Sequence, residues 1–362
     1  MRYPIDADIA SASTLEGRFY SDPEAYAACT ERVFTRTWQW LGTLDDISVS
    51  GSLAPRDLLP DCLDEPLLLA RDAGGTLRCL SNVCTHRGNI LVTAPCHTSQ
   101  IRCGYHSRRF DLDGRMVFMP EFMGVKEFPS RSDDLPQIPF GEWQGHGFAA
   151  LDPAAPLEAF IGDITSRLAW LPVADFEPRP ERRRDFDVAA HWALYVENYL
   201  EGFHIPFVHA GLHQVVDYGS YSTELFEYAN LQVALAKPGE MAFDVPAGRA
   251  DHGKRIAAYY AWVFPNLMLN FYPWGLSLNL VQPQGLARTR VSFRSFVWDA
   301  SKLEAGAGSA LDRVESEDEA IVEAVQRGVR SRLYRKGRYS PTRERGVHHF
   351  HRLLSRFLGS DP

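Results

Sequence analysis

Hydrophobic and polar positions divide the chain into stretches of different periodicity. Near the N-terminus, apolar and aromatic side chains recur at helical spacing at Tyr26, Cys29 and Val33, which predicts a helix within residues 1–39 that packs on a core. Farther along, the pattern changes to short β-forming runs separated by glycine, proline and aspartate. We therefore expect a small antiparallel β domain in residues 40–150.

The second part of the chain mixes longer strand-like runs with helical stretches. Residues 151–160 have the proline and alanine content of a connector, so we place the start of a second domain, residues 151–362, there. The pattern then predicts a helix at 192–210, successive strands between 222 and 300, and a long amphipathic helix at 311–335. Together these elements indicate an α+β fold with a twisted antiparallel sheet and helices on one side.

Composition and charge narrow the function classes. The chain is 45% hydrophobic and 23% charged, which is ordinary for a globular enzyme. Its 38 basic and 46 acidic residues give a net charge of -8, which on average repels nucleic acid and anionic membranes. No apolar stretch approaches the roughly 20 residues that span a bilayer, and the N-terminus lacks the apolar core of a signal peptide. We therefore expect no nucleic acid or membrane partner and a cytoplasmic location.

Two short motifs combine cysteine with histidine. Cys84 and His86 form a Cys-x-His pair, and after sixteen intervening residues Cys103 and His106 form a Cys-x-x-His pair. Six cysteines are too few for a disulfide scaffold in 362 residues, so clustered cysteine and histidine indicate a metal site. Each pair lies in a predicted turn, and two facing loops could present two thiolates and two imidazoles to one metal centre.

This mixed ligand set favours a Rieske centre. In such a centre two histidines replace two cysteines on one of the two irons, which raises the reduction potential. A zinc site uses the same residue types, but its familiar arrangement pairs cysteine with cysteine and histidine with histidine. Chance placement of the four residues is the third possibility.

A second group of metal-binding residues lies in the predicted helix at 192–210. His204 and His209 are five positions apart, and Pro206 between them must distort a regular helix. That distortion can bring both imidazoles to adjacent corners of one coordination sphere. Two histidines and one carboxylate, with open positions, form the facial triad of non-haem iron(II) oxygenases. Histidines at this spacing also occur as core or surface groups, so the pair alone leaves both interpretations open.

With these motifs the chain resembles the alpha subunits of Rieske non-haem iron oxygenases, the aromatic ring-hydroxylating dioxygenase family. The resemblance to the Rieske domain covers residues 40–150 and implies that a two-iron, two-sulfur cluster is held by Cys84, His86, Cys103 and His106. Many family members have glycine and tryptophan after the second histidine. This chain has Ser107 and Arg108 there, which affects the expected local packing and partner contacts more than ligation.

The second motif resembles the mononuclear iron site of the same family. The resemblance implies that His204 and His209 bind Fe(II) and that the third ligand is a distant carboxylate. Because an acidic pair leads the last ligand helix in the family, we choose Asp318. Competing acids stand in the same predicted helix, where the helix dipole alone favours acids near the N-terminus: Asp312, Glu315 and Glu317.

An acidic residue precedes the first histidine by three positions in the family, and Glu201 fills that place. In the family this residue links a cluster histidine of one subunit to an iron-ligand histidine of its neighbour, which orients both imidazoles. Many relatives carry Asp there, so Glu201 resembles the branch that acts on betaines, carnitine and choline. Glu197, one helical turn earlier, is expected to be an exposed helix acid, and the alternative is that it joins the same polar face as Glu201.

The resemblance also implies a helix-grip (START-like) catalytic domain, a homotrimer and a separate reductase of flavin or ferredoxin type. Electrons would pass from the reductase through the cluster to the iron, where O2 is reduced beside a small organic substrate that is hydroxylated or oxidatively demethylated. Aromatic faces can hold a cation, which suits a quaternary ammonium substrate. The pocket is expected to be lined by the sheet segment that contains Trp262, Phe264, Asn270, Tyr272 and Trp274. Core packing is the alternative explanation for the same aromatic side chains, and it stays open at this point.

Three alternatives remain at this point. The same iron could hydroxylate an aromatic acid or arene. A non-catalytic Rieske electron carrier would need only the cysteine and histidine motifs, which leaves residues 151–362 without a purpose. A ligand-binding module without chemistry would use the sheet as a container, and such a protein would be colourless.

Overall fold

The computed structural model describes residues 2–303 and 305–359, and it divides the chain into two compact units. Thr35–Ala154 form the smaller unit, while Met1–Phe34 and Ala155–Pro362 together form the larger one. The N-terminal helix α1 (Pro23–Arg32) thus belongs to the larger unit, where Phe34 packs edge-on against Trp192 at 4.9 Å between ring centroids. The N-terminal segment also pairs with the C-terminal one, through a bridge between Ser13 and Arg338.

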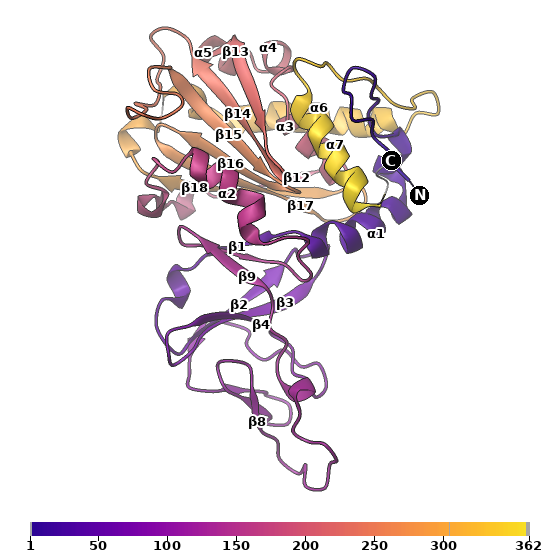
Figure 1. The fold of residues 1–362 in the computed structure, drawn as a ribbon, viewed down its shortest axis with the longest axis vertical. Coiled ribbons are helices and arrows are strands. Elements are labelled where there is room, and N and C mark those ends of the chain that lie inside the picture. The colour runs from indigo at the N-terminus through magenta and orange to yellow at the C-terminus, as the bar shows by residue number, and fades with distance from the viewer. Residues whose placement is uncertain (1, 304, 360–362) are drawn as a thin grey trace. The chain divides into compact units, whose positions relative to one another are not determined.

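The smaller unit consists of three antiparallel sheets (Figure 1). Their orders are β4-β3-β2-β5, β1-β10-β9 and β6-β7-β8. The strands are β1 (Gln39–Thr43), β2 (Ser52–Leu58), β3 (Glu65–Arg71), β4 (Leu77–Ser81), β5 (Cys96–His97), β6 (Ile101–Arg102), β7 (Arg109–Phe110), β8 (Met116–Phe118), β9 (Phe140–Trp143) and β10 (His146–Ala149). Because the strands are short and their connections long, loops make up much of this unit.

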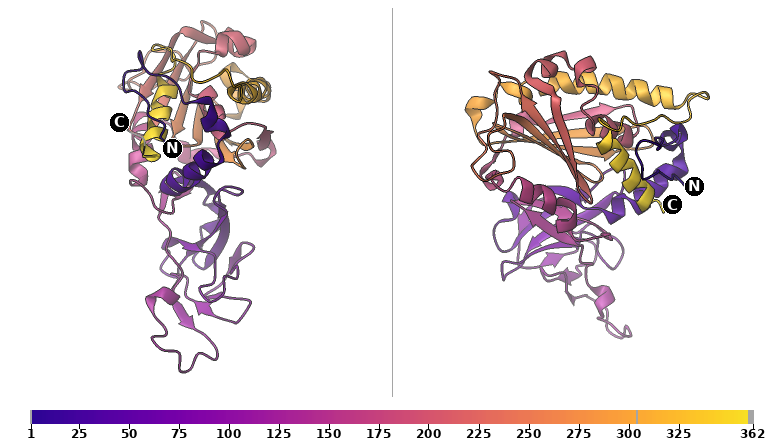
Figure 2. Two further views of the ribbon diagram at one scale, coloured as in Figure 1. Left: turned by 90° about the vertical axis from the view of Figure 1, so that its right-hand side faces the viewer. Right: turned by 45° about the horizontal axis from the view of Figure 1, so that its top comes forward.

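The larger unit is built on one antiparallel sheet of eight strands, ordered β11-β18-β17-β16-β15-β14-β13, with β12 also paired to β18. Figure 2 shows the twist of this sheet. Its strands are β11 (Glu177–Pro178), β12 (Arg184–Val188), β13 (Val216–Leu225), β14 (Ala229–Ala236), β15 (Ile256–Val263), β16 (Leu267–Tyr272), β17 (Gly275–Pro283) and β18 (Thr289–Val297). The predicted α+β fold with a twisted antiparallel sheet is confirmed.

Helices cover this sheet. They are α2 (Leu157–Arg167), α3 (Trp192–Tyr199), α4 (Ile205–Val208), α5 (Ala210–Val215), α6 (Leu311–Val329) and α7 (Arg345–Phe357). Alternate residues of β15 face opposite sides of the sheet. On one side Tyr260 meets Tyr199 of α3 and Trp262 meets Phe350 of α7, and on the other side Tyr259 meets Trp170.

Proline residues interrupt two stretches of the larger unit. The helix expected at 192–210 ends at Tyr199. Pro206 lies in the first turn of the short helix α4, because proline fits the first turn of a helix and disrupts its interior. The run at 256–272 is a hairpin of β15 and β16, since Pro265 cannot continue a central strand.

The helix α7 packs against the segment that follows α3. Its residue Gly346 lies so close to the main chain that an added Cβ would sit 2.3 Å from the carbonyl oxygen of Leu200. Any side chain at this position must therefore push α7 away from the segment that follows α3.

We expect Gly346→Ala to destabilise the larger unit by about 1–3 kcal/mol, because the extra methyl overpacks a contact with rigid backbone. Thermal and urea denaturation followed by circular dichroism measure the effect. The matched control is Gly328→Ala in α6, where nothing lies within 4 Å of the added Cβ and a stabilisation of up to about 1 kcal/mol is expected. Equal stability of the two variants would contradict this account.

Candidate functional site

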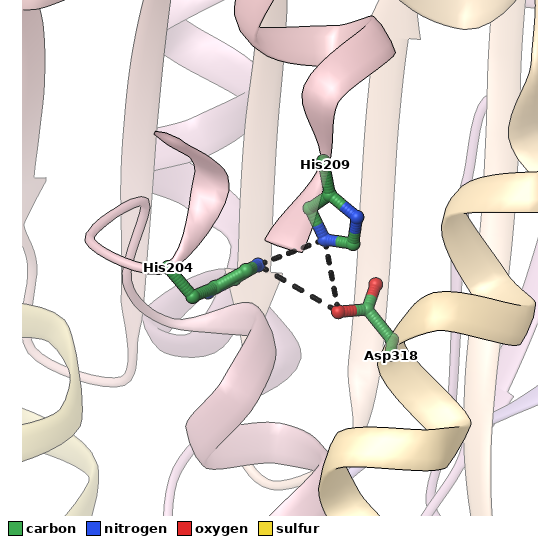
Figure 3. Close-up of side chains that lie close together, drawn as sticks. All are labelled: His204, His209 and Asp318. Atoms are coloured by element: carbon green, nitrogen blue, oxygen red, sulfur yellow. Dashed lines mark hydrogen bonds and ion pairs between the residues drawn. The ribbon is translucent and has the colours of Figure 1, made fainter. Parts of the chain in front are cut away.

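Three side chains from separate elements converge in the larger unit (Figure 3). His204 immediately precedes α4, His209 lies between α4 and α5, and Asp318 projects from α6. The Nε2 atoms of the two histidines are 3.0 Å apart, and Asp318 Oδ1 lies 3.1 Å from His209 Nε2 and 3.6 Å from His204 Nε2. His209 is buried, so this cluster faces the interior.

These separations fit a facial triad around one metal ion. Imidazole nitrogen binds first-row ions at about 2.1 Å, so ligands at right angles to one another lie about 3.0 Å apart. Three donors on one face leave the opposite positions open for other ligands. The three donor atoms already point at a common centre, so these side chains need no rearrangement to bind an ion.

Two further carboxylates, those of Glu201 and Glu317, orient the two imidazoles. Glu201 Oε1 lies 2.7 Å from His204 Nδ1, and Glu201 Oε2 accepts hydrogen bonds from the backbone N–H groups of Phe203 and His204. Glu317 Oε2 lies 2.7 Å from His209 Nδ1. Both contacts keep the proton on Nδ1 and leave the Nε2 lone pair for a metal. Burial lowers the pKa of His209, but its bonds to Asp318 and Glu317 outweigh this effect and raise it.

The acids of α6 have different surroundings, which separates the competitors for the third ligand. Asp312 is exposed, with an ion pair to Arg184 at 3.7 Å, and Glu315 is buried and bonded to the hydroxyl of Tyr195. Only Asp318 of this group joins both histidines among the described residues. The contact of Glu317 with His209 was missed by the sequence analysis, because the run of acids alone does not show which of them faces a histidine.

Glu197 is not the exposed acid that the sequence predicted. Glu197 is half-buried, and its carboxylate accepts a hydrogen bond of 2.7 Å from the hydroxyl of Tyr20. The N-terminal segment covers this face of α3, which helical periodicity could not reveal.

In the smaller unit two loops carry the cysteine and histidine motifs. Cys84 and His86 follow β4, and Cys103 and His106 lie between β6 and β7. Each loop is closed by its own backbone hydrogen bonds, from Gly88 N–H to Cys84 O and from Ser107 N–H to Cys103 O. The ring centroids of the two histidines are 4.8 Å apart, so both loops face a common space.

This space suits an iron–sulfur cluster. Nδ1 of His86 and Nδ1 of His106 are buried and have no hydrogen-bond partner in the described part of the chain. Buried polar atoms without partners are rare, so both nitrogens fit as ligands of a bound group. Burial alone would raise the pKa of Cys103, but the backbone N–H groups of Tyr105 and His106 lower it and so favour the thiolate.

The departure from the family pattern after His106 has a structural consequence. Ser107 adopts a positive φ of 61°, a conformation that favours glycine. Arg108 is buried and forms an ion pair of 2.6 Å with Asp133, and its guanidinium lies over the ring of Phe128. Arg108, which was expected to affect local packing, therefore links the second cluster loop to the segment near Asp133.

A cavity opens beside the triad in the larger unit. Among the expected lining residues, Asn270 and Tyr272 line it. Trp262 and Phe264 do not, because they are fully buried against α7, and Trp274 is buried behind Tyr272. Further lining side chains come from α3, the segment that follows it, α6 and the sheet, and they include Tyr195, Tyr199, Glu201, Tyr221, Gln232, Tyr260, Asn279, Phe293 and Glu315.

Comparison with known families gives two matches that follow one another along the chain. Residues 37–129 match the Rieske [2Fe-2S] domain, and residues 175–360 match the ring hydroxylating alpha subunit (catalytic domain). These two domains define an oxidoreductase that contains a Rieske cluster and a mononuclear iron. The chain belongs to the family of Rieske oxygenase alpha subunits, as its motifs predicted.

Individual relatives extend over nearly the whole chain. The choline monooxygenase of Arabidopsis thaliana is 32% identical over 95% of this chain and 82% of its own length. The carnitine monooxygenase oxygenase subunit of Escherichia coli K12 is 28% identical, over 96% of this chain and 95% of its own.

Solved structures share the fold. A quaternary ammonium Rieske monooxygenase matches with a TM-score of 0.77 at 22% identity, covering 99% of this chain and 100% of its own. A naphthalene 1,2-dioxygenase matches with a TM-score of 0.71 at 16% identity, over 100% of this chain and 96% of its own. The predicted fold, enzyme class and cofactors are thus confirmed, whereas the individual ligands and the domain boundaries stay predictions.

Within the described residues, no helix is both long and apolar enough to cross a membrane. The plant relatives are named chloroplastic, so the expected cytoplasmic location stays a prediction.

We expect Glu317→Gln to lower the iron affinity of the larger unit by roughly 10- to 100-fold, because His209 loses the carboxylate that orients it. Iron content after dialysis, with recovery of activity by added Fe(II), measures the effect. The cluster spectrum should remain unchanged. Asp312→Asn removes an equal charge from an exposed position of the same helix and serves as the control. Iron retention equal to that of this control would refute the assignment.

Proposed function

We propose that this chain is the oxygenase component of a Rieske system that hydroxylates or oxidatively demethylates a small quaternary ammonium compound. The observation that carries the proposal is the composition of the cavity beside His204, His209 and Asp318. Tyrosines and acids line it, and among its described lining residues none is a lysine or an arginine.

The tyrosines form a cage suited to an alkylated cation. Tyr199 and Tyr260 lie 6.5 Å apart between ring centroids, Tyr260 and Tyr272 lie 5.9 Å apart, and Tyr221 also lines the cavity. Burial raises the pKa of each of these four tyrosines, which keeps them neutral. Each aromatic face that contacts a desolvated cation contributes about 0.5–2 kcal/mol.

Hydrogen bonds fix two of these rings. The hydroxyl of Tyr199 donates to Asn270 Oδ1 at 2.6 Å, and the hydroxyl of Tyr221 donates to Gln232 Oε1 at 3.1 Å. Because their hydroxyls are engaged, these tyrosines present mainly ring surface to the cavity, and a trimethylammonium group needs no hydrogen-bond acceptor.

The same composition disfavours the alternative of an aromatic acid. A buried carboxylate needs a basic partner or several hydrogen-bond donors, and here it would meet Glu201 and Asp318 without an arginine beside it. The choline and carnitine monooxygenases among the relatives act on quaternary ammonium compounds, which supports the same substrate class.

Each site residue then has a defined task. His204, His209 and Asp318 would hold the iron, Glu201 and Glu317 would orient the two imidazoles, and the aromatic walls would position the substrate and exclude water. Bound iron(II) supplies the redox chemistry that activates dioxygen. The cluster would be held by two thiolates and two imidazoles, from Cys84, His86, Cys103 and His106.

We also propose a homotrimer that receives electrons from a separate flavin or ferredoxin-type reductase. Inter-subunit electron transfer is described for the related quaternary ammonium monooxygenase. The distance of 2.7 Å between Glu201 Oε1 and His204 Nδ1 supports a connecting role for this carboxylate. In this arrangement the cluster of one subunit serves the iron of its neighbour.

Substrate-dependent oxygen uptake tests the proposed substrate class. Purified enzyme with both iron centres and a surrogate reductase should consume O2 with one or more of choline, glycine betaine, carnitine and related amines. Benzoate, salicylate and naphthalene should give only the background rate. Turnover of the aromatic compounds, with none of the amines, would favour the alternative function.

Mixed oligomers test the electron route. A Cys103→Ser variant lacking the cluster and a His204→Ala variant lacking the iron should each be inactive. When the two are co-expressed and purified together, a neighbour's cluster can supply an intact iron site, so substantial activity should return. Light scattering should give the mass of a trimer. Inactive mixed oligomers would contradict transfer between subunits.

A further inference from the structure

Glu315 is a buried acid whose role the metal centres do not explain. Its residue exposure is 3%, and its Oε2 accepts a hydrogen bond of 2.5 Å from the hydroxyl of Tyr195. The second oxygen, Oε1, has no hydrogen-bond partner in the described part of the chain. The side chain lies along the wall of the cavity that also contains Asp318.

An unpartnered oxygen on a buried carboxyl group is costly to the folded protein. Such a group loses its hydration without a compensating contact, and the loss is greater when the group is charged. Burial accordingly raises the pKa of Glu315 well above its usual range. A ligand that brings a positive charge into the cavity would favour loss of the Glu315 proton and would pair with the resulting carboxylate, whereas a neutral or anionic ligand would not.

We propose that Glu315 is a specificity-determining residue that recognises the positive charge of the substrate. This inference rests on the proposed function, and it adds the residue that distinguishes a cation from an uncharged molecule of the same shape. The tyrosine rings recognise the size and surface of the alkylated head, and Glu315 recognises its charge.

The position of Glu315 supports this division of roles. It stands one helical turn before Asp318 on α6, and its hydrogen bond ties it to Tyr195 on α3, so two packed helices hold it beside the cavity. Glu201 and Glu317 are both engaged with imidazoles. Among the acids that line the cavity, Glu315 is thus the one without a described hydrogen bond to either histidine of the triad.

A pair of probes of equal shape separates charge recognition from packing. Choline carries a trimethylammonium group, and dimethylbutanol carries the uncharged tert-butyl group in its place. Calorimetry with enzyme that holds both iron centres measures the dissociation constant of each probe. Glu315→Gln keeps the shape of the side chain and its bond to Tyr195 but removes the charge.

We expect Glu315→Gln to weaken choline binding by roughly 10- to 100-fold and to change dimethylbutanol binding by less than about threefold. Glu315→Asp, which retains the charge, should preserve most of the discrimination between the probes. Asp312→Asn removes an exposed charge from the same helix and should alter neither dissociation constant.

Other outcomes would overturn the inference. Unchanged choline binding, or an equal loss for both probes, would mean that Glu315 acts only on packing. Loss of iron from Glu315→Gln enzyme would assign the residue to the metal centre instead. A wild-type enzyme that binds dimethylbutanol as tightly as choline, and turns over no amine, would refute the proposed function as well.

Discussion

The convergence of His204, His209 and Asp318 on one point is the constraint on which the larger unit depends. The two histidines flank the short helix α4, while the aspartate comes from α6, more than 100 positions later in the chain. The buried face of α6 contains Glu315, Val322, Gln326 and Val329, and this face holds the helix in the orientation that directs Asp318 inward. Packing at one end of α6 thus fixes the geometry at the other.

Acids around this point differ in role because their surroundings differ. Asp318 faces both histidines, Glu201 and Glu317 each hold the far side of one imidazole, and Glu315 lies buried along the cavity wall. A carboxyl group beside a histidine stabilises one tautomer, while a carboxyl group without a charge partner resists ionisation. Carboxyl groups on α6 and in the segment after α3 can therefore serve metal ligation, orientation of the histidines and recognition of the substrate.

The smaller unit solves a different problem, which is to hold four donors on short loops. Backbone hydrogen bonds close each loop, and the buried ion pair between Arg108 and Asp133 anchors the second one. Burial opposes ionisation of Cys103, but donation from the Tyr105 and His106 N–H groups lowers its pKa and so favours the thiolate. These contacts hold the donor side chains of both loops in positions that suit a bound cluster.

The sequence by itself determined the family, both cofactors and the sheet-based fold, because spacing within the two motifs and strand periodicity are local properties. It also indicated a break near Pro206. The family resemblance pointed to Asp318 among the acids of α6. Only the tertiary structure could decide that Glu317 faces His209, that Glu197 is covered by Tyr20, and that Trp262 and Phe264 pack on α7 away from the cavity. These facts depend on contacts between segments far apart in the chain, where helical or strand periodicity gives the buried face of an element but not its partner.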